Sequence, residues 1–178
     1  MGETEAAAAV TRAREAVDRA VRALAEASAR TETLAEYVPG RRVLGMPRAP
    51  RMSAIGPVWR LGVLLLDVDG GLYATGRVIR AERAVRKSVT AESVAEQRAY
   101  RAAAIKGGIP DGATVVFDAA PIELDADALA ADAASGPLVL RGDEVLVRWS
   151  PTQPDALIPL EAYLRDRVDL IVSPPQGA

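Results

Sequence analysis

The side chains available for chemistry in this chain are limited by an absence, because its 178 residues include neither histidine nor cysteine. A Ser-His-Asp relay needs an imidazole, and a cysteine nucleophile needs a thiol. Structural zinc, blue copper and iron–sulfur centres use the same two residue types as ligands. Catalysis would therefore have to come from carboxylates, hydroxyls, arginines or the two lysines, Lys87 and Lys106.

A pair of carboxylates follows the apolar run Leu64–Leu66, in the order Asp67-Val68-Asp69-Gly70. This arrangement resembles the first motif of the haloacid-dehalogenase-like phosphohydrolases. The resemblance implies that Asp67 is a nucleophile, that Asp69 is its acid/base, and that Mg²⁺ is held between carboxylates. It also implies roles for Lys106 as the cation and for Asp143 in a late acidic motif. The alternative is a hairpin turn, in which Asp and Gly are favoured for backbone reasons. We favour the turn, and we assign no catalytic residue, metal ligand or cofactor.

Basic residues are concentrated in the middle of the chain. Residues 38–87 hold 10 basic and 3 acidic side chains, whereas residues 107–178 hold 4 basic and 12 acidic ones. Such asymmetry is typical of an anion-binding face, but it is also expected if the two regions attract each other within the fold or across a dimer. The candidate anion- or partner-binding residues are Arg41, Arg42, Arg77, Arg80, Arg83 and Arg86.

The guanidinium group suits this interpretation, because its planar fork matches phosphate and carboxylate geometry. Arg48, Arg51 and Arg60 could contribute to the same site. In the alternative interpretation, Arg83 and Arg86 reach carboxylates of the acidic segment. We do not expect a nucleic-acid partner, because the chain has few aromatic side chains to stack bases and a pI near 5.3.

Residues 1–38 predict one long N-terminal helix, which ends at Pro39-Gly40. One set of residues recurs every seven positions, and a second set follows three positions later, which is the pattern of a helix–helix seam. The first set is Val10, Val17, Leu24, Thr31 and Val38, and the second is Ala13, Ala20, Ala27 and Leu34. We therefore expect a homo-oligomer that forms through this helix. The alternative is a surface helix that lies on its own domain.

Residues 39–178 predict a single domain, so that the whole chain is α+β, with mostly antiparallel strands and two or three further helices. Turn residues at 68–71 and 141–143 indicate two hairpins. The expected strands are Arg42–Leu44, Val58–Asp67, Leu72–Arg80, Ala113–Phe117, Leu138–Leu140 and Glu144–Trp149. The expected helices are Ala91–Lys106, capped by Thr90, then Asp125–Ala133, and one that starts at Pro159.

A second resemblance covers most of the chain. The residues that carry it are GRRVLGMPRAP at 40–50, the run Leu61–Leu66, Ala74-Thr75-Gly76 and VRWSP at 147–151. They are similar to a small family of actinobacterial proteins of unassigned role that often carries a glutaminase label. The resemblance implies an amide hydrolase, although no glutaminase catalytic motif is present.

The leading hypothesis is a cytoplasmic, self-associating protein without catalytic activity, whose arginine-rich segment meets an acidic partner surface or a small anion. No apolar run approaches the roughly 20 residues that a membrane span needs, so we expect no membrane association. An amide hydrolase and a magnesium-dependent phosphohydrolase are the alternatives.

Overall fold

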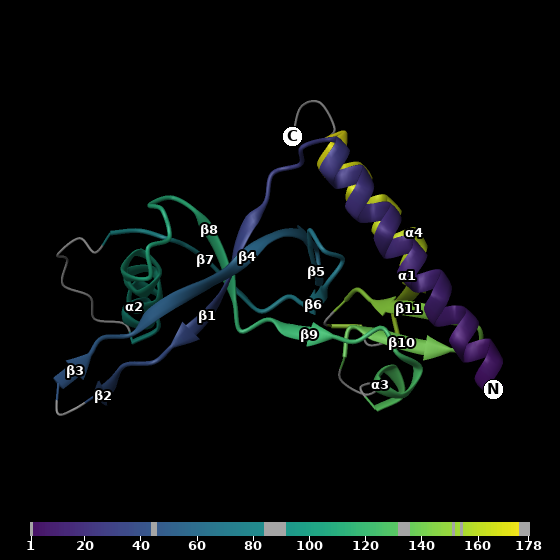
Figure 1. Ribbon diagram of the computed structural model, residues 1–178, viewed down its shortest axis with the longest axis horizontal. Helices are drawn as coiled ribbons and strands as arrows, with labels where there is room; N and C mark the ends of the chain where they lie inside the picture. The colour runs from purple at the N-terminus through teal and green to yellow at the C-terminus, as the bar shows by residue number, and fades with distance from the viewer. Residues whose placement is uncertain are drawn as a thin grey trace. The chain divides into compact units, whose positions relative to one another are not determined.

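The computed structural model describes residues 2–43, 46–83, 92–131, 136–150, 152–153 and 155–174. The fold is α+β, as predicted: the helix α1 (Glu3–Glu26) precedes a mostly antiparallel set of strands and three further helices (Figure 1). The chain forms two compact units. Unit 1 comprises Met1–Arg30, Trp59–Ala74 and Pro121–Ala178, and unit 2 comprises Thr31–Val58 and Thr75–Ala120.

Unit 2 is built on a sheet with the strand order β7-β8-β1-β4. These strands are β1 (Glu32–Val38), β4 (Arg51–Leu61), β7 (Arg77–Arg80) and β8 (Thr114–Phe117). β1 pairs antiparallel with β4 and parallel with β8, and β7 pairs antiparallel with β8. The helix α2 (Glu92–Lys106) packs its buried Ala103 and Ala104 against the core residues Met52, Val115 and Phe117.

A two-stranded hairpin lies between β1 and β4 in the sequence of unit 2. It consists of β2 (Arg41–Val43) and β3 (Met46–Arg48), which pair antiparallel. The sequence predicted a strand at Arg42–Leu44, and Leu44 lies outside the described residues. No strand was predicted between Leu44 and Val58, but this arginine- and proline-rich stretch forms β3 and the start of β4.

Unit 1 contains two groups of strands and three helices. The end of β4 is followed in strand order by β5 (Leu64–Asp67), β6 (Leu72–Ala74) and β9 (Ala120–Ile122). The second sheet has the order β10 (Leu138–Arg141), β11 (Glu144–Arg148) and β12 (Leu157–Pro159). The helices are α1, α3 (Ala126–Ala131) and α4 (Leu160–Val172).

The core of unit 1 forms where α1 and α4 cover these strands. Val17 and Leu24 of α1 are buried with Leu61 and Leu64 of the sheet and with Leu164 of α4. This core shares no residue with the core of unit 2. The two units therefore bury separate sets of apolar side chains.

One tyrosine interrupts the strand that the sequence predicted over Val58–Asp67. The Tyr163 hydroxyl of α4 donates to the carbonyl oxygen of Leu61 at 2.7 Å and accepts from the amide of Val63 at 3.0 Å. Between them Gly62 has a φ of +69°, and a Cβ there would collide with that hydroxyl. The chain thus turns between β4 and β5, because a buried side chain satisfies both backbone groups.

The predicted N-terminal helix is wrong after residue 26. α1 ends at Glu26, Ser28 adopts a φ of +50°, and Glu32–Val38 forms β1 in place of the last helical turns. The expected heptad seam included Leu34, but that residue is buried in the strand opposite Gly56. The tertiary pairing of a β-branched and aromatic segment outweighs a continuing helical pattern here.

The seam residues of α1 pack within their own chain. Val10, Val17 and Leu24 are at most 5% exposed, and they belong to the core of unit 1. They are therefore covered by their own unit, as in the surface-helix alternative. Self-association through α1 stays a prediction.

The predicted strand Leu72–Arg80 is divided in the structure. β6 returns beside β5, as expected of a hairpin, but the chain leaves it at Thr75-Gly76 and β7 pairs with β8. Gly76 lies so close to the backbone of Phe117 that a Cβ would collide with its carbonyl oxygen.

Among the described residues, no helix combines the length and apolar character that a membrane crossing requires.

Candidate anion-binding site

A hollow of about 330 Å³ on unit 2 is lined by four cations. The cations are two arginines of the β2–β3 hairpin, the arginine that begins β4 and the lysine that ends α2, and the other lining side chains are apolar. No aspartate or glutamate lies among the lining residues that the structure describes. The lining residues are Val38, Pro39, Arg41, Pro47, Arg48, Ala49, Arg51 and Lys106.

The hairpin register places two of these cations directly opposite each other. Arg41 of β2 and Arg48 of β3 are cross-strand partners, and like charges at such positions destabilise a strand pair. The chain also passes close to itself at the hairpin's base, where a Cβ on Gly40 would lie 3.0 Å from the Arg48 carbonyl oxygen. Backbone pairing therefore holds together two side chains whose charges repel.

The third arginine enters from the main sheet of unit 2. Arg51 opens β4 and pairs with Val38, the last residue of β1. Only Pro39 and Gly40 separate Val38 from Arg41, the first residue of β2. The start of β4 and the start of the hairpin therefore meet at the same edge, and the arginines of both line one hollow.

The fourth cation is positioned by a close approach of α2 to β4. Lys106 is the last residue of α2, and Gly107 follows it so near the backbone of Met52 that a Cβ would collide with the Met52 carbonyl oxygen. Met52 is fully buried and is the neighbour of Arg51. This contact brings Lys106 to the same end of β4 as Arg51, while the negative end of the helix dipole favours a cation there.

The positive charge of the hollow is not balanced by nearby carboxylates. Within the described part of the chain, none of Arg41, Arg48, Arg51 and Lys106 forms an ion pair or a side-chain hydrogen bond. All four side chains belong to exposed residues. The arrangement can therefore supply several donors to an anion without first breaking internal contacts.

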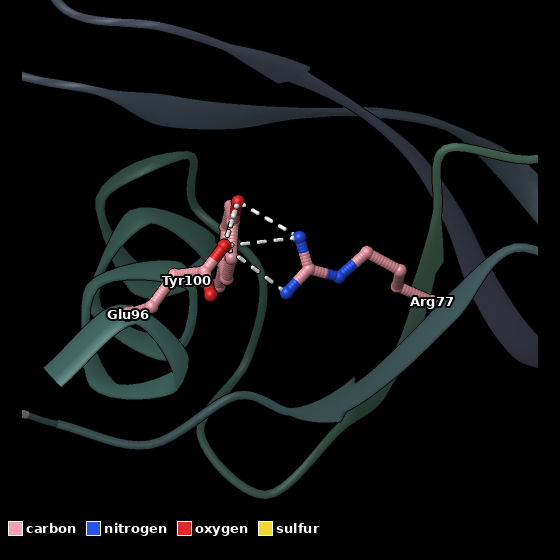
Figure 2. A network of polar contacts seen from close by, with 3 residues as sticks. All are labelled: Arg77, Glu96 and Tyr100. Carbon is pink, nitrogen blue, oxygen red and sulfur yellow. Dashed lines mark hydrogen bonds and ion pairs between the residues drawn. The ribbon is translucent and has the colours of Figure 1, made fainter. Parts of the chain in front are cut away.

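Arg77, another predicted binding residue, is used within unit 2 instead. Its Nη1 lies 3.2 Å from Glu96 Oε1 and donates to the Tyr100 hydroxyl at 2.9 Å, while that hydroxyl donates to Glu96 at 2.9 Å (Figure 2). The guanidinium also stacks 4.4 Å from the centre of the Tyr100 ring and 5.4 Å from that of Phe117. These contacts tie β7 to α2.

Hydrogen bonding sets the ionisation of this network. Desolvation opposes the charge on Arg77, but its hydrogen bonds to Glu96 and Tyr100 outweigh that effect and raise the pKa of the guanidinium. The hydrogen bond from Tyr100, followed by that from Arg77, lowers the pKa of Glu96. The bond to Glu96 in turn raises the pKa of Tyr100. The charge on Arg77 is therefore already matched by a carboxylate.

The remaining predicted residues are not part of the hollow. Arg42 lies on β2 opposite Pro47 and does not line it, and Arg80 and Arg83 are exposed elsewhere in unit 2. Arg83 forms no ion pair within the described residues, so its predicted contact with the acidic segment is not seen there. Arg86 lies outside the described residues, as do Lys87 and the Thr90 cap.

Asp67 occupies the hairpin turn between β5 and β6, as the favoured interpretation predicted. One carboxylate oxygen accepts from the amides of Asp69 at 2.9 Å and Gly71 at 2.7 Å, and the other accepts from the Tyr73 hydroxyl at 3.1 Å. Burial, and then the bond to Asp67, raise the pKa of Tyr73. Asp67 therefore organises its own turn.

Asp143 lies on a different turn, between β10 and β11. The Arg12 guanidinium of α1 donates to its carbonyl oxygen and lies 3.7 Å from its carboxylate. The β5–β6 turn instead packs beside Val17 and Asp18 of α1, more than a helical turn away. Among the described residues, no three acidic side chains gather closely enough to hold a metal ion.

Comparison of the chain with protein-family models, with curated proteins and with solved structures finds no match. The candidate site therefore rests on its own geometry. Sequence reasoning identified Arg41 as a site residue and grouped Arg48 and Arg51 with it, but it named Lys106 only as the cation that the phosphohydrolase resemblance implies. The glycine after Lys106 was interpreted as a helix stop, and it is also the point of contact with β4.

Proposed function

We propose that this protein is a non-catalytic binding protein, and that the four-cation hollow of unit 2 binds a small, multiply charged anion. One observation carries the proposal: Arg41 and Arg48 are held opposite each other, beside Arg51 and Lys106, with no carboxylate in the described lining. Such an arrangement costs free energy when empty, and an anion between the cations would offset the repulsion.

The size of the hollow favours a small ligand over an extended acidic surface. Its volume of about 330 Å³ is near the lower end of the range of ordinary ligand pockets, roughly 300–1,000 Å³. The guanidinium forks suit phosphate or carboxylate groups, and the walls formed by Val38, Pro39 and Pro47 would contact an apolar part of the ligand. The ligand class is therefore a phosphate- or carboxylate-bearing small molecule with at least two negative charges.

Calorimetric titration at low salt tests this proposal, with pyrophosphate, citrate and polyglutamate as probes. Pyrophosphate or citrate should bind the wild type, and Arg48→Gln should weaken binding roughly tenfold or more, because a hydrogen bond to a charged group contributes about 1.5–3 kcal/mol. Raising the salt concentration should weaken binding further.

Arg42→Gln is the matched control, because it removes the same charge from the same hairpin at a residue that does not line the hollow. Its affinity should stay within about twofold of wild type, since it alters only the long-range field. Equal losses of affinity in Arg42→Gln and Arg48→Gln would show that anions bind diffusely to a basic surface, and this result would contradict binding in the hollow. Binding of polyglutamate alone would favour an acidic protein partner in place of a small anion.

A further inference from the structure

A second hollow, independent of the basic one, lies on unit 1 between the side-by-side helices α1 and α4 (Figure 1). It encloses about 430 Å³. Its floor is apolar, and its rim carries two cations and two anions. The floor is formed by Ala16, Ala20, Ala23, Val168 and Val172, and the rim by Arg19, Glu161, Arg165 and Asp169.

Only part of the groove's apolar lining is open to solvent: Ala16 and Ala20 are 4% and 5% exposed and belong to the core of unit 1, whereas Ala23 and Val168 are half-buried. Ala16 and Ala20 of α1 are small, so they leave space beside α4 where larger side chains would fill it. Val172 of α4 remains 40% exposed at the end of this groove. Val17 and Leu24, the larger seam residues of α1, belong to the same core but do not line the groove.

The charges around the groove differ from those of the rest of the unit. Unit 1 holds 10 basic and 17 acidic side chains, a net charge of −7, whereas unit 2 holds 12 basic and 7 acidic ones, a net charge of +5. The groove rim, in contrast, is neutral, with Arg19 and Glu161 joined across it at 2.8 Å. Two copies of unit 1 would repel each other over most of their surfaces, but not at this face.

The two other charged residues of the rim, Arg165 and Asp169, have opposite signs, so the same two residues on a second copy could pair with them. Arg165 and Asp169 lie one turn apart on α4, about 6 Å along the helix. Among the described residues, Arg165 forms an ion pair only with the neighbouring Asp166, at 3.3 Å and largely exposed, and Asp169 forms none. A twofold axis between two antiparallel α4 helices would place Arg165 of each copy opposite Asp169 of the other.

We propose that this groove is the contact face of a homodimer, in which a second copy of the chain covers the apolar floor and exchanges two reciprocal Arg165–Asp169 ion pairs. The same surface patch is then used on both copies, as a twofold contact requires. A partner of strong single-sign charge fits this rim less well, because it would meet as many like charges as opposite ones. The proposal does not depend on the anion-binding hollow.

Charge reversal tests the twofold geometry directly, with mass measured by light scattering and sedimentation at high micromolar concentration. Wild type should be dimeric. Arg165→Asp places two aspartates opposite each other, Asp169→Arg places two arginines opposite each other, and each variant alone should show at least a tenfold weaker dimer. An equimolar mixture of the two variants should regain the dimer mass, because every pair is then of opposite charge.

Arg22→Asp is the matched control, since Arg22 is exposed on α1 but does not line the groove. It should dimerise like wild type. Circular dichroism of each variant checks that a change of mass is not a loss of folding, and recovery in the mixture makes the same check independently. A monomeric wild type, or a dimer that neither reversal weakens, overturns the proposal. So does a mixture of the two variants that stays monomeric.

Discussion

At the scale of single residues, Asp67 shows how a carboxylate can resemble a catalytic group and yet serve the backbone. Both of its oxygens accept hydrogen bonds from its own hairpin, two from backbone amides and one from Tyr73. Gly71 is required beside it, because a Cβ at this position would collide with the carboxylate. The Asp-x-Asp-Gly pattern is thus accounted for by turn geometry.

This geometry predicts that Asp67→Asn is tolerated whereas Asp67→Ala is not. Asparagine keeps an oxygen for the two amides, so the free energy of unfolding should change by about 1 kcal/mol or less. Alanine leaves the two amides and the Tyr73 hydroxyl without their acceptor, which should cost roughly 1–3 kcal/mol. Urea denaturation of both variants measures the difference.

Asp69→Asn provides the comparison within the same turn, since only the amide of Asp69 takes part in these bonds. Its free energy of unfolding should match that of wild type. If Asp67→Asn were as costly as Asp67→Ala, the carboxylate charge itself would be needed, and the hydrogen-bond explanation would be wrong.

At the scale of elements, Arg77 joins a strand to a helix through groups that titrate. The lowered pKa of Glu96 means that the folded state favours its ionised form, chiefly through the hydrogen bond from Tyr100 and then through Arg77. The stabilisation is therefore present above the ordinary titration range of glutamate and is lost as the pH falls through the lowered value. The contact between β7 and α2 should weaken in acid.

Melting temperatures of wild type and Glu96→Gln over a pH series test this contact. The two proteins should differ most above about pH 5, and the difference should shrink below about pH 4. Glu36→Gln serves as the control, because Glu36 is exposed on β1 and forms no ion pair with a described residue. A difference between wild type and Glu96→Gln that did not vary with pH would rule out the charged form as the source.

The elements also show what the sequence could and could not predict. The hairpins at 68–71 and 141–143, the helix α2 up to Lys106 and the helix α4 after Pro159 follow from turn residues and apolar spacing, and the structure confirms them. The end of α1 was missed because Leu34 and Val38 continue its seven-residue pattern. That pattern carries no information about the pairing of β1 with β4 and β8.

The sequence indicated the arginine-rich character of the candidate site, but it did not indicate which residues line the site. Charge counts indicated an arginine-rich anion site that included Arg41, and local spacing suggested that Arg77 belonged with it. Arg77 instead donates a hydrogen bond to Tyr100 of α2. Lys106 lines the hollow because Gly107, the next residue, lies close to the backbone of Met52. Both facts depend on how a helix packs on a sheet, which residue spacing along one segment does not encode.

At the scale of the whole molecule, the two cores share no buried residue among those that the structure describes. Leu24 in unit 1 and Met52 in unit 2 are both fully buried. Replacing either by alanine should cost roughly 2–5 kcal/mol. Because the cores are separate, we expect Leu24→Ala to speed hydrogen exchange mainly in β5 and α4, and Met52→Ala mainly in β8 and α2.

Hydrogen-exchange mass spectrometry of the two variants makes this comparison, with wild type as the reference for every peptide. Peptides from the unmutated unit should keep their protection in each case. Equal loss of protection throughout both units, in both variants, would show that the chain unfolds as one cooperative body despite its two cores.

The opposed arginines of the β2–β3 hairpin make the stability of this hairpin sensitive to ionic strength. Repulsion between Arg41 and Arg48 acts to open the hairpin, while the backbone ladder acts to close it. Dissolved ions weaken that repulsion within a Debye length of about 8 Å at physiological ionic strength. Salt and the proposed anion would therefore both weaken the repulsion between Arg41 and Arg48, so raising the salt concentration should stabilise the hairpin while it weakens anion binding.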